Sequence, residues 1–274
     1  MNAITTLLRH FAAAIGLAML TATALAAPSA KLIEYWLPAD STVDATISHQ
    51  AWQHILNRYL ISNDSGMTLF KYSAVSSSDR QALKTYLKDL QAIDPRRYPR
   101  DEQQAYWINL YNALTVDVVL DAYPVKSIRD LGWFTKGPWD KKVATIVGKK
   151  LSLNDIEHGI LRPIWKDSRI HYAVNCASFS CPNLSPIAYT SANVEEQLQQ
   201  AAHDYINSPR GIDTSGDKLL LSSIFKWYRS DFGANEQELL NTLAEHAEPD
   251  LAKLLKSYQG EIDYDYNWDL NEAR

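Results

Sequence analysis

Residues 102–123 constrain the fold of this 274-residue chain more than any other segment. Projected at about 100° per residue, the segment shows one apolar stripe and further apolar residues over most of the remaining helix surface. The stripe consists of Trp107, Leu110, Tyr111, Leu114 and Val118, and the other apolar positions are Ala105, Ile108, Val116, Val119 and Leu120. A helix that is apolar nearly all round is a buried one, so the segment predicts a central helix inside a sizeable core.

Two amides interrupt this apolar helix near its middle. Asn109 and Asn112 lie about 60° apart, on the side away from Trp107. Burying an amide without partners costs about 1–3 kcal/mol, so both side chains should be hydrogen-bonded. Two interpretations stay open: the amides clamp a neighbouring loop, or they form the polar floor of a site.

The rest of the chain mixes helices and short strands without regular alternation, which favours an α+β fold. We expect a mostly helical single domain over residues 48–274, with the central helix packed on a small antiparallel sheet, after a loose N-terminal arm over 27–47. Further helices are expected over 48–59, 78–92, 155–161, 193–206, 236–247 and 250–258, with Ser78, Ser152 and Asn193 as caps. Strands are expected over 67–72, 170–175 and 219–224, and a hairpin over 143–153 with its turn at Gly148-Lys149.

The first 26 residues have the pattern of a cleavable secretory signal peptide. Arg9 and His10 form a small basic region, and the apolar run 11–20 falls within the ~7–15 residues of a signal core. The triplet Ala24-Leu25-Ala26 has the small residues that a signal peptidase reads. A spanning helix needs about 20 apolar residues, so a membrane anchor is not expected after cleavage. We expect cleavage after Ala26 and a periplasmic or secreted protein.

Charge and glycine content exclude several functional classes. Without residues 1–26, and hence without Arg9, the chain carries 26 basic and 32 acidic residues. A net charge of −6 provides no electrostatic footprint for nucleic acid or an anionic membrane. Only 10 glycines are present, which argues against a glycine-rich phosphate loop. We therefore expect no nucleic-acid partner and no nucleotide cofactor.

Cys176 and Cys181 are the only cysteines. In an oxidising compartment two thiols indicate a disulfide, and a four-residue gap can reach the Cα separation of about 4.4–6.8 Å that one requires. So small a loop, however, provides little entropic stabilisation. An inert buried thiol pair and a reactive Cys176 are the alternatives. A zinc site is less expected, because exported proteins with two thiols rarely use them this way.

The chain holds every group that a thiol nucleophile needs. A thiol reacts when a nearby imidazole or positive helix end lowers its pKa, and a carboxylate or amide normally orients the imidazole. The candidates are Cys176 as nucleophile, His158 or His171 as imidazole, and Glu157, Asn109 or Asn112 as the orienting group. Spacing alone does not show that these groups meet.

Five motifs follow one another along the chain: AYWINLYNA at 105–113, SLNDIEHGILR at 152–162, RIHYAVNCASFSCPNL at 169–184, IFKWYRSDF at 224–232 and YDYNWDLN at 264–271. In sequence and in order they resemble the motifs of the domain-of-unknown-function family 547. The resemblance spans roughly residues 52–271. It implies an exported single-domain protein of the bacterial type, similar in outline to papain-like or transglutaminase-like folds. Here the helix carries asparagine where those enzymes place cysteine, so their triad does not carry over.

The resemblance also bears on the cysteines. In plant relatives the position matching Cys176 remains cysteine, whereas the one matching Cys181 is often serine. This implies that Cys176, rather than a disulfide, is the chemically important residue. The positions of Glu157-His158, Asn109 and Asn112 match the family pattern too, which ranks His158 above His171.

Two functions follow as hypotheses. The first is a thiol-dependent hydrolase or transferase on amide or ester bonds: Cys176 attacks, His158 takes its proton, and Glu157 or Asn112 orients the ring or binds the oxyanion. The second is a non-catalytic interaction module with a Cys176–Cys181 disulfide. Its aromatic surface would hold a peptide, a glycan or an envelope protein and would consist of Trp133, Trp139, Trp227 and Tyr228.

Overall fold

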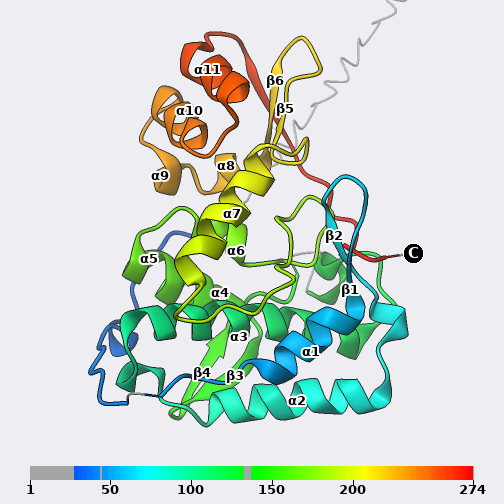
Figure 1. Cartoon of the computed structure of the whole chain (residues 1–274), viewed down its shortest axis with the longest axis vertical. Helices are drawn as coiled ribbons and strands as arrows, with labels where there is room; N and C mark the ends of the chain where they lie inside the picture. Colours follow the sequence, from blue (N-terminus) through cyan, green and yellow to red (C-terminus); the bar gives the residue numbers. More distant parts are fainter. Residues whose placement is uncertain (1–27, 44, 133–136, 274) are drawn as a thin grey trace, which may run out of the picture.

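The structure is a computed structural model that describes residues 28–43, 45–132 and 137–273. It has the expected α+β architecture, with more helix than strand. Figure 1 shows a wider lobe crossed by helix α3 and a smaller lobe formed by β5, β6 and α8–α11, with α7 running between the two. The predicted signal peptide, residues 1–26, lies outside the described residues, and so does Trp133.

The elements follow one another without regular alternation. The longer helices are α1 (Gln50–Tyr59), α2 (Ser77–Gln91), α3 (Arg100–Ala122), α7 (Val194–Ile206), α10 (Glu236–Ala244) and α11 (Pro249–Ser257). The short ones are α4 (Leu153–Ile156), α5 (Arg162–Trp165), α6 (Ile170–Ala173), α8 (Ser223–Trp227) and α9 (Arg229–Phe232). Single tight turns occur at η1 (Glu34–Trp36), η2 (Tyr72–Ala74), η3 (Pro95–Arg97) and η4 (Ile128–Leu131), and a π-helical turn at η6 (Glu157–Leu161).

Helix α3 is the central buried helix that the sequence predicts. Every residue from Glu102 to Val116 is buried, including Asn109 and Asn112. Its principal neighbours are α2, α4, η3, η6 and α7. The expected packing on a small sheet is therefore replaced mainly by packing on helices, which the all-round apolar surface of α3 allows.

The strands of the described residues form three small sheets. β1 (Leu60–Ser62) pairs with β2 (Thr68–Phe70), and β3 (Lys142–Ile146) with β4 (Lys149–Ser152), both antiparallel. In the third sheet β6 (Leu219–Ser222) lies between antiparallel β5 (Ile212–Asp213) and parallel β7 (Ile262–Asp265). The predicted hairpin is confirmed, but its turn is at Val147-Gly148, where both φ angles are positive as a two-residue hairpin turn requires.

The strand predicted over 170–175 is wrong, because Ile170–Ala173 forms one turn of helix, α6. All six residues of that stretch are buried, so an alternation of apolar and polar residues could not distinguish a strand from a helix there. Two predicted caps are also wrong. Ser76, not Ser78, caps α2, and Asn193 makes no capping bond to α7. Ser152 does cap α4, in a reciprocal capping box with Asp155.

The N-terminal arm, expected to be loose, packs against the domain. Helices α4 and α5 are joined by the π turn η6, and Pro163 follows inside the same helix. A π turn and a proline leave helical carbonyls without their usual partners. Lys31 N–H donates to His158 O and Ile33 N–H to Gly159 O, both at 2.9 Å. The arm therefore completes the hydrogen bonding of the helix that carries Glu157 and His158.

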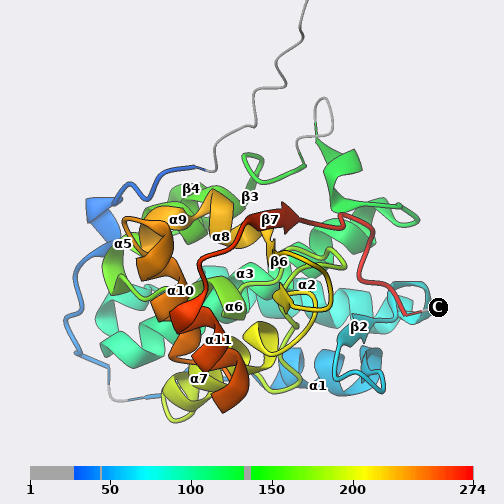
Figure 2. The same ribbon diagram turned by 90° about the horizontal axis from the view of Figure 1, so that it is seen from above.

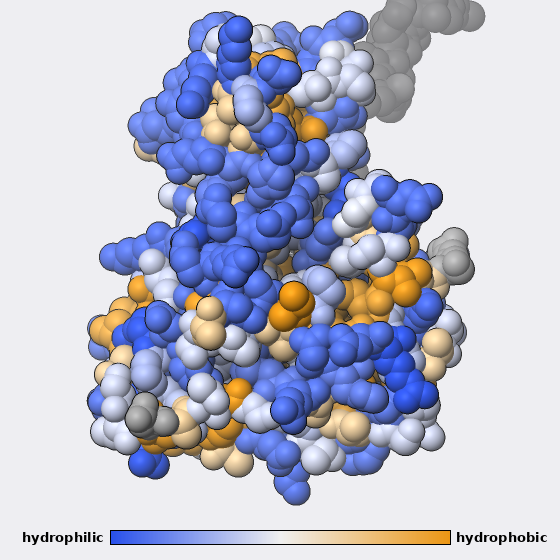
Figure 3. Space-filling view, viewed as in Figure 1, coloured by the Kyte–Doolittle hydropathy of each residue, from blue (hydrophilic) through white to orange (hydrophobic). Residues whose placement is uncertain are grey.

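Two apolar cores underlie the two lobes. The large core surrounds α3 and includes Trp36, Trp107 and Phe70, whereas the small core includes Tyr205, Phe225, Phe232 and Leu239. Figure 2 shows β7 lying above α3, with the chain continuing from it toward the C-terminus. In Figure 3 the visible face is mostly hydrophilic, with most apolar atoms on the wider lobe. No helix in the described part of the chain is both long and apolar enough to cross a membrane.

Candidate functional site

The π turn places Glu157 and His158 at the junction of the two lobes. Glu157 is buried, accepts a hydrogen bond from the Tyr111 hydroxyl at 3.0 Å, and has its Oε1 3.7 Å from Nδ1 of both His158 and His171. The structure thus brings both histidines considered from the sequence to the same carboxylate oxygen. π turns inside α-helices frequently occur at functional sites, because they turn side chains out of the regular pattern.

Arg162 joins this group to the small lobe. Its guanidinium makes a two-pronged contact with Asp231 of α9, with Nε and Nη2 donating at 2.6 and 2.9 Å. The Asp231 carboxylate also accepts from His171 Nε2 at 2.8 Å. Burial raises the pKa of Asp231, but the hydrogen bonds from His171 and Arg162 outweigh burial and hold that pKa well below its usual range.

The protonation of His158 follows from its contact with Arg162. Arg162 Nη1 lies 3.0 Å from His158 Nδ1. Because a guanidinium can only donate, Nδ1 accepts, and the neutral ring carries its proton on Nε2. Burial lowers the pKa of His158; Glu157 raises that pKa and Arg162 lowers it further. His158 is therefore a neutral imidazole near pH 7, with a donor rather than an acceptor at its second nitrogen.

Tyr228 covers this network from the small lobe. Its ring stacks on His171 at 4.2 Å and 20°, and Arg162 lies over its face at 4.8 Å. A cation over an aromatic face gains from the negative charge of the ring's π cloud. Tyr228 and Asp231 therefore fix α8 and α9 onto η6 and α6. We call this group the lobe network; its members are Glu157, His158, Arg162, His171, Tyr228 and Asp231.

Cys176 lies at the end of the chain segment that follows α6, and its sulfur contacts hydroxyl groups. Cys176 Sγ is 3.1 Å from Ser178 Oγ and 3.2 Å from the Tyr266 hydroxyl, and these two hydroxyls are 2.8 Å apart. The backbone N–H of Cys176 donates to Cys181 Sγ at 2.9 Å. Both cysteines are free thiols; Cys176 is half-buried and Cys181 is buried.

These contacts give the two thiols different pKa values. Burial raises the pKa of Cys176, but hydrogen bonds from Cys181, Ser178 and Tyr266 outweigh burial and lower that pKa from 9.0 to about 7. Burial raises the pKa of Cys181 well above its usual value, and the neighbouring Cys176 raises it further. Cys176 is consequently the thiol that ionises first, and Cys181 remains protonated beside it.

The sulfur and the imidazoles occupy adjacent but separate positions. In the described structure the hydrogen-bond partners of Cys176 Sγ are the side chains of Ser178, Tyr266 and Cys181, and none is a histidine. Burial raises the pKa of the Tyr111 and Tyr228 phenols, and the charges of Glu157 and Cys176 raise both pKa values further. Both tyrosines are therefore within electrostatic range of the thiol and of the lobe network.

Asn109 and Asn112 act as clamps on distant backbone. Asn112 Nδ2 donates to Ala173 O at 2.9 Å, and its Oδ1 accepts from Asn175 N–H at 2.8 Å. In the same way, Asn109 Nδ2 donates to Tyr189 O at 2.7 Å, and Asn109 Oδ1 accepts from Tyr189 N–H at 3.0 Å. The loop-clamp interpretation of the two amides is confirmed. The clamp made by Asn112 ends one residue before Cys176, so it positions the thiol.

A cluster of half-buried aromatic rings adjoins the thiol. The Tyr266 ring contacts Trp227 at 4.8 Å and Trp268 at 4.6 Å, and Trp268 contacts Trp139 at 5.7 Å. Trp139 and Trp227 were predicted to form an aromatic surface, and the structure brings both to this cluster. Tyr228, from the same prediction, packs in the lobe network instead.

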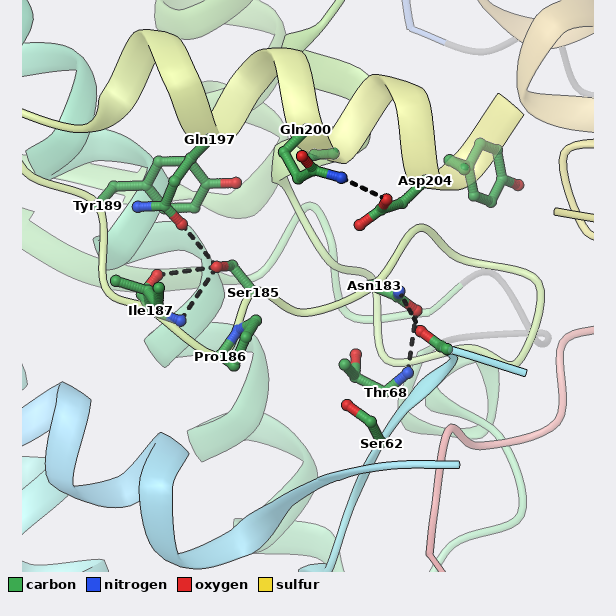
Figure 4. A pocket seen from close by; sticks show the side chains of 13 residues that line it. Ser62, Thr68, Asn183, Ser185, Pro186, Ile187, Tyr189, Gln197, Gln200 and Asp204 are labelled. Atoms are coloured by element: carbon green, nitrogen blue, oxygen red, sulfur yellow. Dashed lines mark hydrogen bonds between the residues drawn. The ribbon is translucent and has the colours of Figure 1, made fainter. Parts of the chain in front are cut away.

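A separate pocket of about 230 Å³ lies between α7, the β1–β2 hairpin and the segment after Cys181. Figure 4 shows amide and hydroxyl side chains along it, with Ser185 bonded to Gln197 at 2.6 Å and Gln200 to Asp204 at 2.7 Å. None of the site residues predicted from the sequence lines this pocket. Arg210 connects this pocket with the cysteines, because it donates to Cys181 O and to the Oδ1 of Asn183, which lines the pocket.

Sequence reasoning missed four groups that the structure places at the site: Arg162, Ser178, Asp231 and Tyr266. Arg162 is four residues after His158, a spacing that puts two side chains on the same helix face. Asp231 and Tyr266 lie in the motifs IFKWYRSDF and YDYNWDLN, so the resemblance contained them without indicating what they contact.

Among the described residues, no group of three or more histidine, cysteine or acidic side chains could hold a metal ion. No curated protein and no solved structure significantly matches the chain, so a likeness to papain or transglutaminase folds stays a prediction. Residues 95–206 match the model of DUF547, described as a protein of unknown function. This match is shorter than the resemblance over 52–271 and ends before Asp231 and Tyr266. It does include Asn109, Asn112, His158, His171 and both cysteines, and over residues 95–206 the chain is similar to the DUF547 family.

Proposed function

We propose that the chain is a thiol-dependent hydrolase or transferase for amide or ester bonds, with Cys176 as its nucleophile. The observation that carries the proposal is the half-buried free sulfur of Cys176, which two hydroxyls contact and whose pKa is lowered to about 7. At pH 7 about half of such a thiol is thiolate, the form that attacks carbonyl carbon.

In the proposed reaction the Cys176 thiolate forms a carbon–sulfur bond to the substrate carbonyl. The carbonyl π electrons move to oxygen, and their return expels the amine or alcohol, which leaves with a proton. The Tyr266 hydroxyl, which contacts the sulfur, is proposed to donate that proton to the leaving group and to recover a proton from the nucleophile of the next step. Water, or an acceptor nucleophile in a transferase, then releases the acyl group from the thioester.

The role of His158 in this proposal differs from the sequence hypothesis. A base is not required for a thiol that ionises near pH 7, and the Nε2 of His158 carries a proton. We propose that Glu157, His158 and His171 position the small lobe, and with it the aromatic rings beside the sulfur. Asn112 is proposed as a positioning residue for the Cys176 loop rather than an oxyanion donor, because both ends of its amide are already hydrogen-bonded.

The pH dependence of alkylation tests the nucleophile. Because the pKa of Cys176 is lowered, we expect the iodoacetamide rate of the native chain to rise tenfold per unit below about pH 7 and to level off above it. The unfolded chain should level off only near pH 9. The label should be lost in Cys176→Ser and kept in Cys181→Ser. A native midpoint above pH 8.5 would contradict the proposal.

Activity is tested with a panel of activated esters and peptide anilides, followed by intact mass. We expect hydrolysis, with an acyl adduct on Cys176 that is absent from Cys176→Ser. A panel that produces neither turnover nor an adduct at any pH from 6 to 9, with Cys176 shown to be reduced, would overturn the enzymatic proposal.

A second candidate is an interaction module for a peptide, a glycan or an envelope protein. The half-buried rings of Trp139, Trp227, Tyr266 and Trp268 favour it, because Trp and Tyr offer a large apolar area with little loss of conformational entropy on binding. Quenching of tryptophan fluorescence by peptide and glycan mixtures would support it, provided that Cys176→Ser binds as well as the unmodified chain. Export to the periplasm or medium remains part of both proposals, and fractionation of cells checks it.

A further inference from the structure

Cys181 lies directly behind Cys176, at a distance that the backbone fixes. The N–H of Cys176 donates to Cys181 Sγ at 2.9 Å. Because the N–Cα bond is about 1.46 Å long, Cys181 Sγ lies within about 4.4 Å of Cys176 Cα. The two thiols are therefore neighbours in space while both are reduced.

The loop that joins the two thiols is held at both ends. Asn175 accepts from Ala177 N–H at 2.8 Å and donates to Pro182 O at 2.7 Å, so its side chain bridges the loop. Arg210 donates to the carbonyl of Cys181. Ala177 has a φ of 59°, a left-handed conformation that costs a non-glycine residue about 1–3 kcal/mol and persists only when its surroundings impose it. The clamps keep the sulfurs close without a covalent bond.

The two sulfurs differ in access and in charge. Cys176 is half-buried, and two hydroxyls contact its sulfur. Cys181 is 3% exposed, and its sulfur also contacts Val174 O. A reagent from solution therefore meets the ionised thiol first and finds the protonated thiol behind it. This is the arrangement of an attacking thiol with a resolving partner.

We propose that Cys176 is an oxidation site for hydroperoxides and that Cys181 resolves the oxidised sulfur as a reversible disulfide. The Cys176 thiolate attacks the terminal peroxide oxygen and the O–O bond breaks. Hydroxide leaves from hydrogen peroxide, or an alkoxide from an organic hydroperoxide, as Cys176 becomes a sulfenic acid. The Cys181 sulfur then attacks the sulfenic sulfur. A sulfur–sulfur bond forms, and the displaced hydroxyl leaves as water with the Cys181 proton. Peroxide is the oxidant, and an external dithiol restores both cysteines.

The inference rests on the same reactive sulfur as the proposed function but goes beyond it. In the disulfide form Cys176 has no free thiolate, so any acyl-transfer activity stops until the disulfide is reduced. Resolution by Cys181 also protects Cys176 from further oxidation to sulfinic acid, which most proteins cannot reverse. The bridge would therefore be a reversible oxidised state, and not the permanent structural link considered from the sequence.

The test uses the full chain, fully reduced and then treated with hydrogen peroxide, and is followed by intact mass and peptide mapping. We expect the loss of two hydrogen atoms, a Cys176–Cys181 cross-linked peptide, and full reversal by dithiothreitol. In Cys181→Ser, which keeps a hydrogen-bond donor, we expect one dimedone adduct per chain on Cys176 when dimedone is present, and sulfinic acid on Cys176 when dimedone is absent. In Cys176→Ser, Cys181 should stay reduced.

Formation of sulfinic acid on Cys176 in the unmodified chain, without the bridge, would overturn the inference. Faster oxidation of Cys181 than of Cys176 would overturn it as well. Circular dichroism of each variant verifies that it is folded, and Cys181→Ala repeats the test if Cys181→Ser is not. The readout is separate from ester hydrolysis: a bridge without hydrolytic activity disproves only the proposed function, and hydrolysis without a bridge disproves only this inference.

Discussion

The contacts inside each of the two lobes differ in kind from the contacts that join one lobe to the other. Inside each lobe, aromatic and aliphatic side chains pack around a core, and in the wider lobe Asn109 and Asn112 fasten loops to α3. Between the lobes the contacts are charged and aromatic, with Arg162, Asp231 and His171 at the centre. Apolar packing thus builds the lobes, and a buried polar network sets how they meet.

The candidate site lies where these two kinds of contact adjoin. Tyr172 packs in the small core, whereas Ala173 and Ala177 pack in the large one, so the segment that leads to Cys176 passes from one core to the other. Tyr266 also contacts Cys176, and in the sequence it lies between β7, which pairs with β6 of the small lobe, and Leu270, which packs in the large core. A change in how the lobes meet should therefore change the reactivity of the thiol.

The largest expected effect comes from breaking the lobe network. Arg162→Met leaves Asp231 without its guanidinium, and loss of one partner of a buried ion pair typically costs about 3–5 kcal/mol of unfolding free energy. Hydrogen exchange should accelerate in α8–α11 and stay unchanged in the middle of α3. Arg96→Met is the matched control: Arg96 pairs with Asp94 two residues away inside one lobe, and we expect a loss of at most about 1 kcal/mol. Equal losses in urea unfolding would contradict the comparison.

An intermediate effect is expected from the two asparagine clamps. Asn112→Ala and Asn109→Ala each leave a buried N–H and a buried carbonyl without a partner, so each should lower the unfolding free energy by about 1–3 kcal/mol. Only the Asn112 clamp ends beside Cys176, so only Asn112→Ala should change the alkylation rate of the thiol. Iodoacetamide kinetics at pH 7 measure this. A similar change in Asn109→Ala would show that stability, and not position, controls the reactivity.

The smallest effect concerns one hydroxyl group that crosses between the lobes. Tyr266→Phe removes a hydrogen bond to Cys176 Sγ, worth about 0.5–1.5 kcal/mol, and should raise the pKa of Cys176 from about 7 by about one unit. The alkylation midpoint should therefore shift to higher pH, and the rate at pH 7 should fall. Tyr264→Phe, two residues earlier on β7, should leave the midpoint unchanged. An unshifted midpoint in Tyr266→Phe would show that Tyr266 does not stabilise the thiolate.

Much of the fold could be predicted from local patterns. The apolar surface of α3, the capping box at Ser152, the hairpin of β3 and β4, and the amphipathic pattern of α10 and α11 all depend on neighbours a few residues apart. Predictions failed where a segment is buried on every side, as at α6, because periodicity then carries no signal. The arm was predicted to be loose because its partners, the carbonyls of His158 and Gly159, are more than 120 residues away.

The sequence by itself determined an α+β chain with a buried central helix, two hydrogen-bonded asparagines, and a set of residues capable of thiol chemistry. Only the tertiary structure decided which groups meet. It places Cys176 beside Ser178 and Tyr266, and His158 beside Glu157 and Arg162. The physical reason is range: helix periodicity and capping act over a few residues, whereas the acidity of a buried thiol depends on whatever group packs against it, here from 90 residues further along the chain.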